Sequence, residues 1–342
     1  MRFIKKLLRF LLVLVVIVVT IYAIGPRVEK PNLDTGIPQV TSNLAELENE
    51  ILVKEKSNPK IKEGNSSRFV WFDSVPRKTT YSVLYLHGWS ASHEEGAPLH
   101  RLIAKRYGAN LYLPRLAGHG IAENEPMLNL TATDYLNSAK EALAVAKTIG
   151  EKVIVIGTST GGTLGLWLAS FDETIEILLL YSPNVAIYDS TSKLLSGPWG
   201  TELVRLVQGG DYFSFKADSI KQQYWTTKYR IEALPHLQVL IDQTMTEATF
   251  KKVKQPVFMG YYFRDEENQD KVVSVPDMLS MFERLGTSEN LKRKKAFPDV
   301  DDHVMTSHIT SKDFDSFKKE TFSYLETVLN LQPVKEEIIK NQ

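Results

Sequence analysis

The sequence contains no cysteine, and this absence excludes several kinds of chemistry. Without cysteine the chain has no disulfide, no thiolate ligand for a metal, no thiol nucleophile and no cysteine for N-terminal lipid attachment. An excess of either charge is also absent, because 41 basic residues balance 41 acidic residues. The balance gives no indication of nucleic-acid binding, so we expect no nucleic-acid partner. Internal repeats and low-complexity segments are missing as well.

What is present is an ordinary globular composition, except at the N-terminus. Hydrophobic residues make up 43% and charged residues 24% of 342 residues, which suits one large α/β domain with an insertion or two smaller domains. The chain opens with the basic residues Arg2, Lys5, Lys6 and Arg9. An uncharged run, mostly Leu, Val and Ile, follows from Phe10 to Pro26. Its length lies at the short end of what spans a bilayer as a helix.

This apolar run has three interpretations: a cleaved signal peptide, a buried helix of a soluble domain and an uncleaved membrane anchor. A cleaved signal peptide would end at a small-residue site, and Ile21-Tyr22-Ala23 is a poor site of that kind. A buried helix of a soluble domain would show a polar face, and the run has none. We therefore predict an uncleaved transmembrane anchor over residues 1–26. The basic residues before it predict a membrane protein with the rest of the chain on the non-cytoplasmic side.

A linker with one short helix is expected over residues 27–65. Pro31, Gly36 and Pro38 interrupt regular structure there. Asn43, with a glutamate three residues later, is typical of a helix start. This segment is expected to separate the anchor from the main domain or to pack on its outside.

From residue 66 onwards, apolar strands alternate with helices. Strands are expected over 68–72, 81–86, 110–114, 153–156, 175–181, 256–262 and 291–297. This alternation predicts an α/β fold with a doubly wound, mostly parallel sheet, in which ligands bind at the carboxyl ends of strands. The alternation lapses over the aromatic-rich residues 188–254, which are expected to form an inserted helical cap. Residues 66–187 and 255–332 would then form the core.

The pentapeptide Gly157-Thr158-Ser159-Thr160-Gly161 lies between an apolar strand and a helix. Small residues two places on either side of a serine allow a strained turn that exposes its hydroxyl, as in a nucleophile elbow. Ser159 is therefore the candidate nucleophile. A tight glycine turn with an incidental serine is the alternative interpretation.

A serine hydroxyl needs a base, most often a histidine held by a carboxylate. Of seven histidines, His303 follows the last strand and fits the chain order serine, acid, histidine. His308 lies nearby in the sequence, whereas His87 and His119 belong to earlier turns and are interpreted as structural. A surface histidine without a catalytic role is the alternative for His303.

Five stretches together resemble the α/β-hydrolase superfamily, and within it the carboxylesterases and monoacylglycerol lipases with a helical cap. They are Gly157–Gly161, His87–Trp89, Pro114–Gly120, Asp270–Val273 and Asp302–Val304. The resemblance covers the chain from about Arg68 to Leu331. It implies an α/β-hydrolase fold and a catalytic triad, and it implies no metal and no organic cofactor.

The resemblance also implies roles for single residues. Ser159 resembles the nucleophile and His303 the base, while the backbone N–H groups of Trp89 and Thr160 match the two oxyanion donors. The assignment of the triad acid is less direct. In the family the acid lies shortly after one of the last strands, but here a long loop follows that strand and contains both Asp265 and Asp270. Asp270 is predicted, since it precedes an apolar pair in the Asp-x-Val-Val form of the family, whereas Asp265 lies in a charged run.

These features predict a membrane-anchored serine hydrolase that cleaves carboxylic esters, such as acylglycerols or short- and medium-chain acyl esters, through an acyl-enzyme. The expected partners are an ester or lipid substrate and the membrane. A serine peptidase or an acyltransferase with the same triad is an alternative, and a non-catalytic surface-binding module is another. An aspartate nucleophile is excluded by serine at the apex of the turn.

Overall fold

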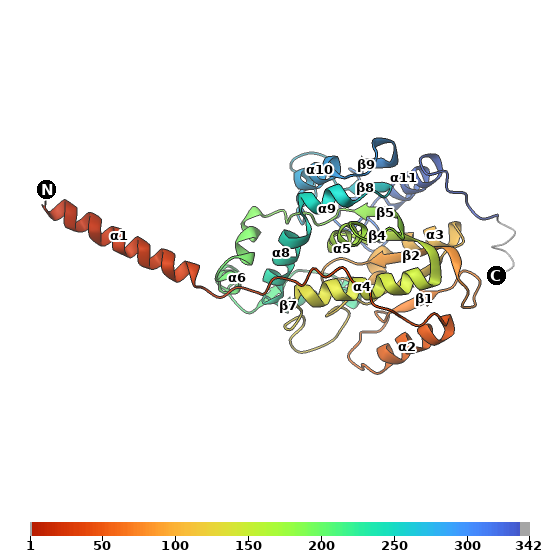
Figure 1. The fold of residues 1–342 in the computed structure, drawn as a ribbon, viewed down its shortest axis with the longest axis horizontal. Helices are drawn as coiled ribbons and strands as arrows, with labels where there is room; N and C mark the ends of the chain where they lie inside the picture. Colours follow the sequence, from red (N-terminus) through yellow and green to blue (C-terminus); the bar gives the residue numbers. More distant parts are fainter. Residues whose placement is uncertain (1, 336–342) are drawn as a thin grey trace.

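The computed structural model describes residues 2–335, so Met1 of the predicted anchor and residues 336–342 lie outside the described part. At its centre is a sheet built from β1 (Arg68–Val70), β2 (Thr79–Leu86), β3 (Asn110–Leu113), β4 (Gly150–Thr158), β5 (Ile175–Tyr181), β8 (Val257–Tyr261) and β9 (Lys292–Ala296). The strand order is β1-β3-β2-β4-β5-β8-β9 (Figure 1). Only β1 runs antiparallel to its neighbour among these described strands. The prediction of a doubly wound, mostly parallel sheet is confirmed.

Helices cover both faces of the sheet. One face is covered by α4 (Ala132–Ile149), α5 (Thr160–Ala169) and α10 (Val275–Arg284), and the other by α3 (Leu99–Arg106) and α11 (Phe314–Thr327). Successive strand residues point to opposite faces, so Leu84 packs on the α4 side and Tyr85 on the α3 side. Because both faces are buried at the centre of the sheet, β4 and β5 carry continuous apolar runs, whereas the edge strand β9 is mostly lysine and only partly buried.

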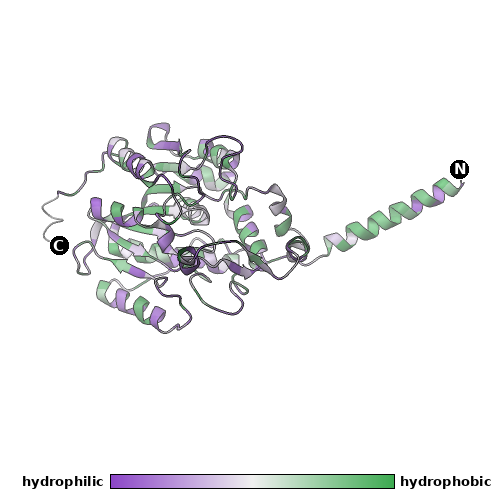
Figure 2. Cartoon of the chain, turned by 180° about the vertical axis from the view of Figure 1, so that it is seen from behind, coloured by the Kyte–Doolittle hydropathy of each residue, from purple (hydrophilic) through white to green (hydrophobic). Residues whose placement is uncertain are grey.

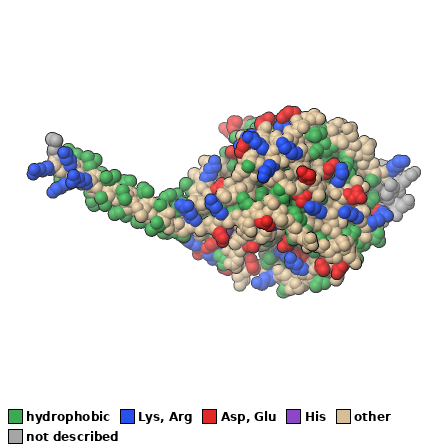
Figure 3. All heavy atoms as spheres, in the orientation of Figure 1, with side chains coloured by type: hydrophobic (Ala, Val, Ile, Leu, Met, Phe, Trp, Pro, Cys, Tyr) green, Lys and Arg blue, Asp and Glu red, His purple; other side chains and the backbone are tan. Residues whose placement is uncertain are grey.

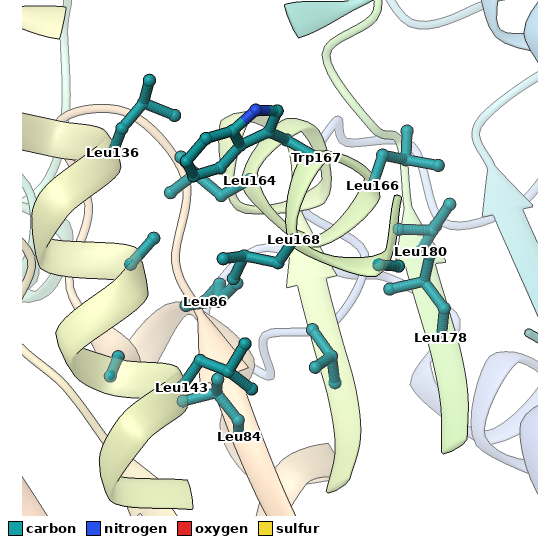
Figure 4. Packing of buried hydrophobic residues seen from close by; sticks show 14 of the residues in the cluster. Leu84, Leu86, Leu136, Leu143, Leu164, Leu166, Trp167, Leu168, Leu178 and Leu180 are labelled. Carbon is teal, nitrogen blue, oxygen red and sulfur yellow. The ribbon is translucent and has the colours of Figure 1, made fainter. Parts of the chain in front are cut away.

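Figure 4 shows the core beneath the turn of Ser159, where strand residues of β2 and β5 meet α4 and α5. Every residue of α5 is buried. Leu164, Leu166 and Leu168 have no exposed surface, and Trp167 is 4% exposed. A helix that is apolar on all sides has to lie inside the protein, so the segment that follows Ser159 is held rigidly on the sheet.

Between β5 and β8 the chain leaves the sheet. The elements there are η2 (Ser190–Ser196), α6 (Gly200–Gln208), β6 (Tyr212–Ser214), α7 (Ser219–Tyr224), β7 (Lys228–Arg230), α8 (Ala233–Thr244) and α9 (Glu247–Lys252). The antiparallel pair of β6 and β7, which α7 separates in the sequence, was not expected. Its aromatic residues account for part of the aromatic-rich stretch, and the rings of Phe213 and Tyr229 lie 5.3 Å apart across the two strands.

The N-terminal segment forms two helices that differ in their contacts. α2 (Leu44–Lys56) packs against the domain and begins where the sequence predicted, with the Asn43 side chain accepting from the N–H of Glu46. α1 (Arg2–Ala23) projects away from the domain and has no buried residue. Figures 2 and 3 show its apolar surface and the cluster of basic side chains at its free end.

The predicted transmembrane helix is not supported. Within residues 2–335, none of the helices is both long enough and apolar enough to cross a bilayer. The reason lies in where α1 begins and ends: it starts among the basic residues and stops at Ala23. Its uncharged part, from Phe10 to Ala23, measures about 21 Å at 1.5 Å per residue, which is shorter than the roughly 30 Å of a hydrocarbon core.

Candidate active site

Ser159 lies at the sharp turn between β4 and α5, at the carboxyl edge of the sheet. Its backbone has φ +54° and ψ −123°, a conformation that residues with a side chain rarely adopt. The surrounding structure holds it there: the Ser159 N–H donates to the carbonyl of Tyr181 at 2.9 Å, and its carbonyl accepts from the N–H of Asn184 at 2.9 Å. The expected elbow geometry is therefore present at this serine.

The two glycines of the pentapeptide are required by close packing around this turn. A Cβ on Gly161 would lie 1.9 Å from the carbonyl oxygen of Leu86 on β2. A Cβ on Gly157 would lie 2.6 Å from the carbonyl oxygen of Gly161. Only glycine lets the start of α5 approach β2 this closely, so the Gly-x-Ser-x-Gly spacing has a steric cause here.

His303 lies in the loop after β9 and pairs with Asp270 from the loop after β8. His303 Nδ1 is 2.6 Å from Asp270 Oδ2, and the Asp270 carboxylate has no exposed surface. The other carboxylate oxygen, Oδ1, accepts the backbone N–H groups of Val272 at 2.9 Å and Val273 at 3.1 Å. These contacts fix the carboxylate in one orientation against the imidazole.

The carboxylate of this pair is ionised at neutral pH. Burial raises the pKa of Asp270, but the His303 imidazole and the two backbone N–H groups outweigh burial and hold that pKa below its usual value. Burial lowers the pKa of His303, and Asp270 reverses this effect, so that the pKa of the imidazole is raised. Because Asp270 is ionised, Nδ1 of His303 carries a proton and Nε2 is free to act as the base.

Asp265, the competing candidate for the acid, lies elsewhere. Its carboxylate accepts the backbone N–H of Glu267 at 3.0 Å and the backbone N–H of Asn268 at 2.8 Å, so it caps its own turn. The structure brings Asp270, not Asp265, to His303.

The loops of Ser159 and His303 are joined next to both residues. The Thr158 hydroxyl lies 3.2 Å from the Thr306 hydroxyl. Ser159 is 6% exposed, and its hydroxyl has no hydrogen-bond partner among residues 2–335. Nε2 of His303 also has no hydrogen-bond partner among these described residues. A catalytic serine–histidine bond is often long without substrate and tightens when substrate binds.

The proposed oxyanion donors lie at the end of β2 and the start of α5. Among the described residues, the backbone N–H groups of Trp89 and Thr160 donate to no protein group. The loop of Trp89 is held by His119, whose Nε2 accepts the N–H of Ser90 at 2.9 Å and whose Nδ1 donates to the carbonyl of Ala117 at 2.7 Å. Burial lowers the pKa of His119 to about 4, so it stays neutral and able to accept.

Within the described residues, His87 and His308 bind backbone groups rather than the Ser159 hydroxyl or the Asp270 carboxylate. His87 Nε2 accepts the N–H of Leu116 at 3.1 Å, which supports its interpretation as structural. His308 Nδ1 donates to the carbonyl of Ala97 at 3.0 Å. Of the two histidines after the last strand, His303 alone faces a carboxylate among the described residues.

One residue of the site was missed in the sequence. Glu95 is 1% exposed and binds the N–H of Gly88, immediately before Trp89. The sequence Glu94-Glu95 is typical of a solvated charged turn, so no local signal distinguishes Glu95 from its neighbour.

Among residues 2–335 no group of three acidic or histidine side chains is arranged to hold a metal. A groove of about 860 Å³ lies between α2 and α4, and its lining does not include Ser159 or His303.

Comparisons with known proteins extend this description. The sequence model of the Alpha/beta hydrolase family matches residues 83–312, which include the turn of Ser159 and the loop of His303. A thermostable monoacylglycerol lipase from Bacillus sp. (strain H-257) is 38% identical over 93 residues, which is 27% of this chain and 36% of that lipase. The matched part therefore spans about a third of the length of this curated relative.

Solved structures show the same fold. One, from a study of LipS and LipT, two metagenome-derived lipolytic enzymes, has a TM-score of 0.62 at 18% identity and covers 78% of this chain and 99% of that chain. A soluble variant of monoglyceride lipase from Saccharomyces cerevisiae, in complex with a substrate analog, has a TM-score of 0.56 at 13% identity. It covers 77% of this chain and 90% of that chain. At sequence identities this low, the similarity shows a shared fold and does not extend to the activity.

Proposed function

The chain belongs to the alpha/beta hydrolase family, and from this membership we propose that it is a serine hydrolase that cleaves carboxylic esters through an acyl-enzyme. The observation that supports the proposal most strongly is the buried Asp270–His303 pair, 2.6 Å long, beside the strained turn of Ser159. Strain at one serine and a buried carboxylate are costly features, and enzymes retain such features at functional sites.

In this proposal His303 is the general base and Asp270 holds it in one tautomer. His303 Nε2 takes the proton of the Ser159 hydroxyl as the Ser159 oxygen attacks the ester carbonyl carbon. The imidazole becomes positively charged, and the ionised Asp270 stabilises that charge without taking the proton. The same imidazole then gives the proton to the departing alkoxide, which leaves as the alcohol.

The second half of the reaction repeats this proton transfer with water. His303 takes a proton from a water molecule that attacks the acyl carbon, and returns it to the Ser159 oxygen as the acid is released. In both halves the carbonyl oxygen becomes an oxyanion. The backbone N–H groups of Trp89 and Thr160 are proposed to bind it, and each such donor contributes roughly 10²–10³-fold to the rate.

An acylglycerol or a short- to medium-chain acyl ester is the proposed substrate class. Its support is the partial identity with a monoacylglycerol lipase, which covers 27% of this chain. A panel of p-nitrophenyl esters and monoacylglycerols of increasing chain length would identify the acyl preference. If this protein cleaved peptides and none of these esters, the proposed substrate class would be contradicted.

The experiment that tests the serine mechanism is labelling with a fluorophosphonate probe, which requires an activated serine. We expect the wild-type protein to be labelled and Ser159→Ala to be unlabelled, with ester turnover near background. Ser170→Ala, at the other end of α5, is the matched control, because its hydroxyl contacts only the carbonyl of Trp167. Labelling or turnover that survives in Ser159→Ala would contradict the mechanism.

We also propose that α1 holds the enzyme at a membrane. In the described part of the chain its apolar side chains are all exposed, for example Leu12 at 63% and Val16 at 55%. The uncharged part of α1, about 21 Å long, is shorter than an average hydrocarbon core, and a helix of that length inserts only where the bilayer thins locally and long basic side chains reach the interface. The basic residues at the N-terminus favour a catalytic domain on the non-cytoplasmic side, which stays a proposal.

Fractionation of cells tests the membrane proposal. Val15→Glu should move the full-length protein from the membrane fraction to the supernatant, because a charge in the middle of the run opposes insertion. Val53→Glu, at a 56% exposed position of α2, is the matched control and should leave the distribution unchanged. Protease added outside spheroplasts should digest the domain. A protected domain would contradict the proposed side, and a wild-type protein in the supernatant would contradict membrane association.

A further inference from the structure

Glu95 is a second buried carboxyl group in the site, beside the pair of Asp270 and His303. It lies in η1 (His93–Gly96), the short helix that follows the loop of Trp89, and is 1% exposed. It is close to the nucleophile, because a Cβ on Gly88 would lie 2.9 Å from Glu95 Oε1 and 3.0 Å from Ser159 Cβ. The proposed reaction gives this group no role.

A closed ring of hydrogen bonds includes Glu95. Its Oε2 atom lies 2.9 Å from the hydroxyl of Tyr85, which in turn lies 3.0 Å from the hydroxyl of Thr158. The Thr158 hydroxyl is 3.2 Å from that of Thr306, and Thr306 donates to the backbone carbonyl of Glu95 at 2.9 Å. The same Oε2 atom also accepts the N–H of Gly88 at 2.7 Å.

The number of hydrogens in this ring determines the protonation of Glu95. A carbonyl only accepts, so the single hydrogen of Thr306 goes to the Glu95 carbonyl. The bond between the two threonines then requires the hydrogen of Thr158, and the bond from Tyr85 to Thr158 requires the hydrogen of Tyr85. No hydroxyl hydrogen is left for the contact between Tyr85 and Glu95. With the Tyr85 hydrogen on Thr158, that contact is a hydrogen bond when Glu95 is a protonated acid that donates to the Tyr85 oxygen. When Glu95 is ionised, Tyr85 donates to Glu95 and its bond to Thr158 is lost, so the complete ring requires the neutral acid.

The ring connects the three segments that the reaction needs. Thr158 immediately precedes Ser159, Thr306 follows His303 by three residues, and Gly88 immediately precedes Trp89. Glu95 therefore joins the three segments: its side chain binds the oxyanion loop directly and the nucleophile turn through Tyr85, and its backbone carbonyl binds the histidine loop. Small displacements of such loops cost large factors in rate, because the reacting groups have to be aligned.

We propose that Glu95 is a positioning residue of this active site, which acts as a neutral carboxylic acid to join the three loops and whose ionisation changes the proton affinity of His303. The proposal rests on the serine hydrolase function above. It assigns Glu95 no contact with substrate, and the Oε2 atom that carries the positioning role is bound by Gly88 and Tyr85.

The electrostatics of the site agree with the hydrogen count. Burial raises the pKa of Glu95 to about 7, although the Gly88 N–H, Tyr85 and the charges of His303 and Lys221 lower it. The titratable groups that face Glu95 come from four segments: Tyr85 of β2, Tyr135 of α4, Lys221 of α7 and His303 of the loop after β9. Once ionised, Glu95 adds to the effect of Asp270 and raises the pKa of His303.

The pH dependence of kcat/KM in Glu95→Gln tests this proposal. An amide offers a donor or an acceptor at the Oε2 position but not both, so we expect kcat/KM to fall about 10- to 100-fold through loop misalignment. Removal of the ionisable group should also lower the apparent pKa of the acid limb by roughly half a unit or more. A purely structural defect would lower kcat/KM by the same factor at every pH and leave the apparent pKa of the acid limb unchanged. An unchanged acid limb in Glu95→Gln would overturn the electrostatic part of the proposal.

Glu94→Gln is the matched control for this variant. Glu94 is the preceding residue, keeps 20% of its side chain exposed and lies 3.9 Å from Arg101. We expect its kcat/KM and its acid limb to equal those of the wild type. A shift of the same size in both variants would mean that the Glu95 effect is a general one of net charge, and would overturn the proposal.

A measurement without turnover separates this proposal from the serine hydrolase function and does not require the variant to fold. In wild-type protein labelled with ¹³C at the glutamate δ-carbon, one glutamate should titrate near pH 7 rather than near 4.5. If no glutamate titrates between about pH 6 and 8, the neutral acid is wrong, whatever the activity. A wild-type protein with this titration but without esterase activity or fluorophosphonate labelling would contradict the proposed function and leave Glu95 as a neutral acid.

Discussion

The turn of Asp270 and the turn of Glu95 both bury a carboxyl group next to His303, but they shift the pKa of that group in opposite directions. Both residues are 1% exposed. The pKa of Asp270 is held below its usual value, whereas the pKa of Glu95 is raised to about 7. Equal burial therefore leaves one group charged and the other neutral at mildly acid pH.

The difference comes from the groups that donate to each carboxylate. Asp270 faces an imidazole that takes up a proton, and two backbone N–H groups bind its second oxygen. Glu95 has one backbone N–H and a tyrosine hydroxyl whose hydrogen is used elsewhere in the ring. Two or three donors to the charged form offset the desolvation of a carboxylate, and one does not.

The largest effect is expected when the charge at the Asp270 turn is removed. Asp270→Asn presents an amide to Nδ1 of His303 and favours the tautomer in which Nε2 carries the proton and cannot act as a base. By the precedent of such triads, kcat/KM should fall by about 10⁴-fold with the fold intact. Ester turnover and circular dichroism of the same preparation measure both quantities.

Asp265→Asn is the control for this prediction. Its carboxylate is exposed and binds only its own turn, so kcat/KM should stay within about twofold of wild type. If Asp265→Asn lost activity and Asp270→Asn kept it, the loop after β8 would have a different arrangement in the working enzyme.

The next largest effect concerns stability, where the two carboxyl groups should respond to pH in opposite directions. A pKa raised from 4.5 to about 7 stabilises the folded protein below pH 4.5, and this contribution is lost as the pH rises through 7. The stability difference between wild type and Glu95→Gln should therefore decrease by about 3 kcal/mol over that range. Urea unfolding at a series of pH values measures it, and a flat difference would contradict the raised pKa.

For Asp270 the same measurement should give a different curve. Its pKa is lowered and that of His303 is raised, so the pair stabilises the folded protein between the two values. The stability difference between wild type and Asp270→Asn should decline as the pH falls below 3.8, and again as the pH rises from 6.5 through the raised pKa of His303. A difference that follows the Glu95→Gln curve instead would show that burial alone sets both charges.

The smallest effect is expected at a third buried carboxylate, which meets a permanent cation. Glu55 of α2 binds the Arg115 guanidinium at 2.8 Å and 2.9 Å and is 6% exposed. Glu55→Gln should lower the unfolding free energy by about 1–3 kcal/mol, because Arg115 loses a buried charged partner. Glu176→Gln at the exposed pair with Lys152 should change it by less than about 1 kcal/mol. Equal losses in the two variants would contradict the role of burial.

Much of this site could be predicted from the sequence because its signals are local. The strand, the glycine-flanked serine and the helix are consecutive, and their spacing has a steric cause at Gly157 and Gly161. The alternation of strands and helices predicted the sheet, and the order of Ser159 and His303 along it indicated the candidate base. The choice of Asp270 over Asp265 came from a family resemblance, and the geometry at His303 agrees with it.

The parts that were missed depend on contacts between distant residues. The end of α1 at Ala23, short of Pro26, reduces the helical length of the apolar run from about 26 Å to about 21 Å, further below the roughly 30 Å of a hydrocarbon core. The antiparallel pair of β6 and β7 consists of two strands of three residues each, and strands of that length are too short to show a clear alternation of apolar and polar residues.

The sequence by itself determined the sheet, the turn at Ser159 and the residues that can supply a base and an acid, because these follow from periodicity and from steric limits within a few residues. The tertiary structure alone decided that Glu95 is buried and that its neighbour Glu94 is partly exposed. It also decided which carboxyl group is charged. The pKa of a carboxyl group depends on its donors, and those of Glu95 and Asp270 come from segments as far apart as β2 and the loop after β9.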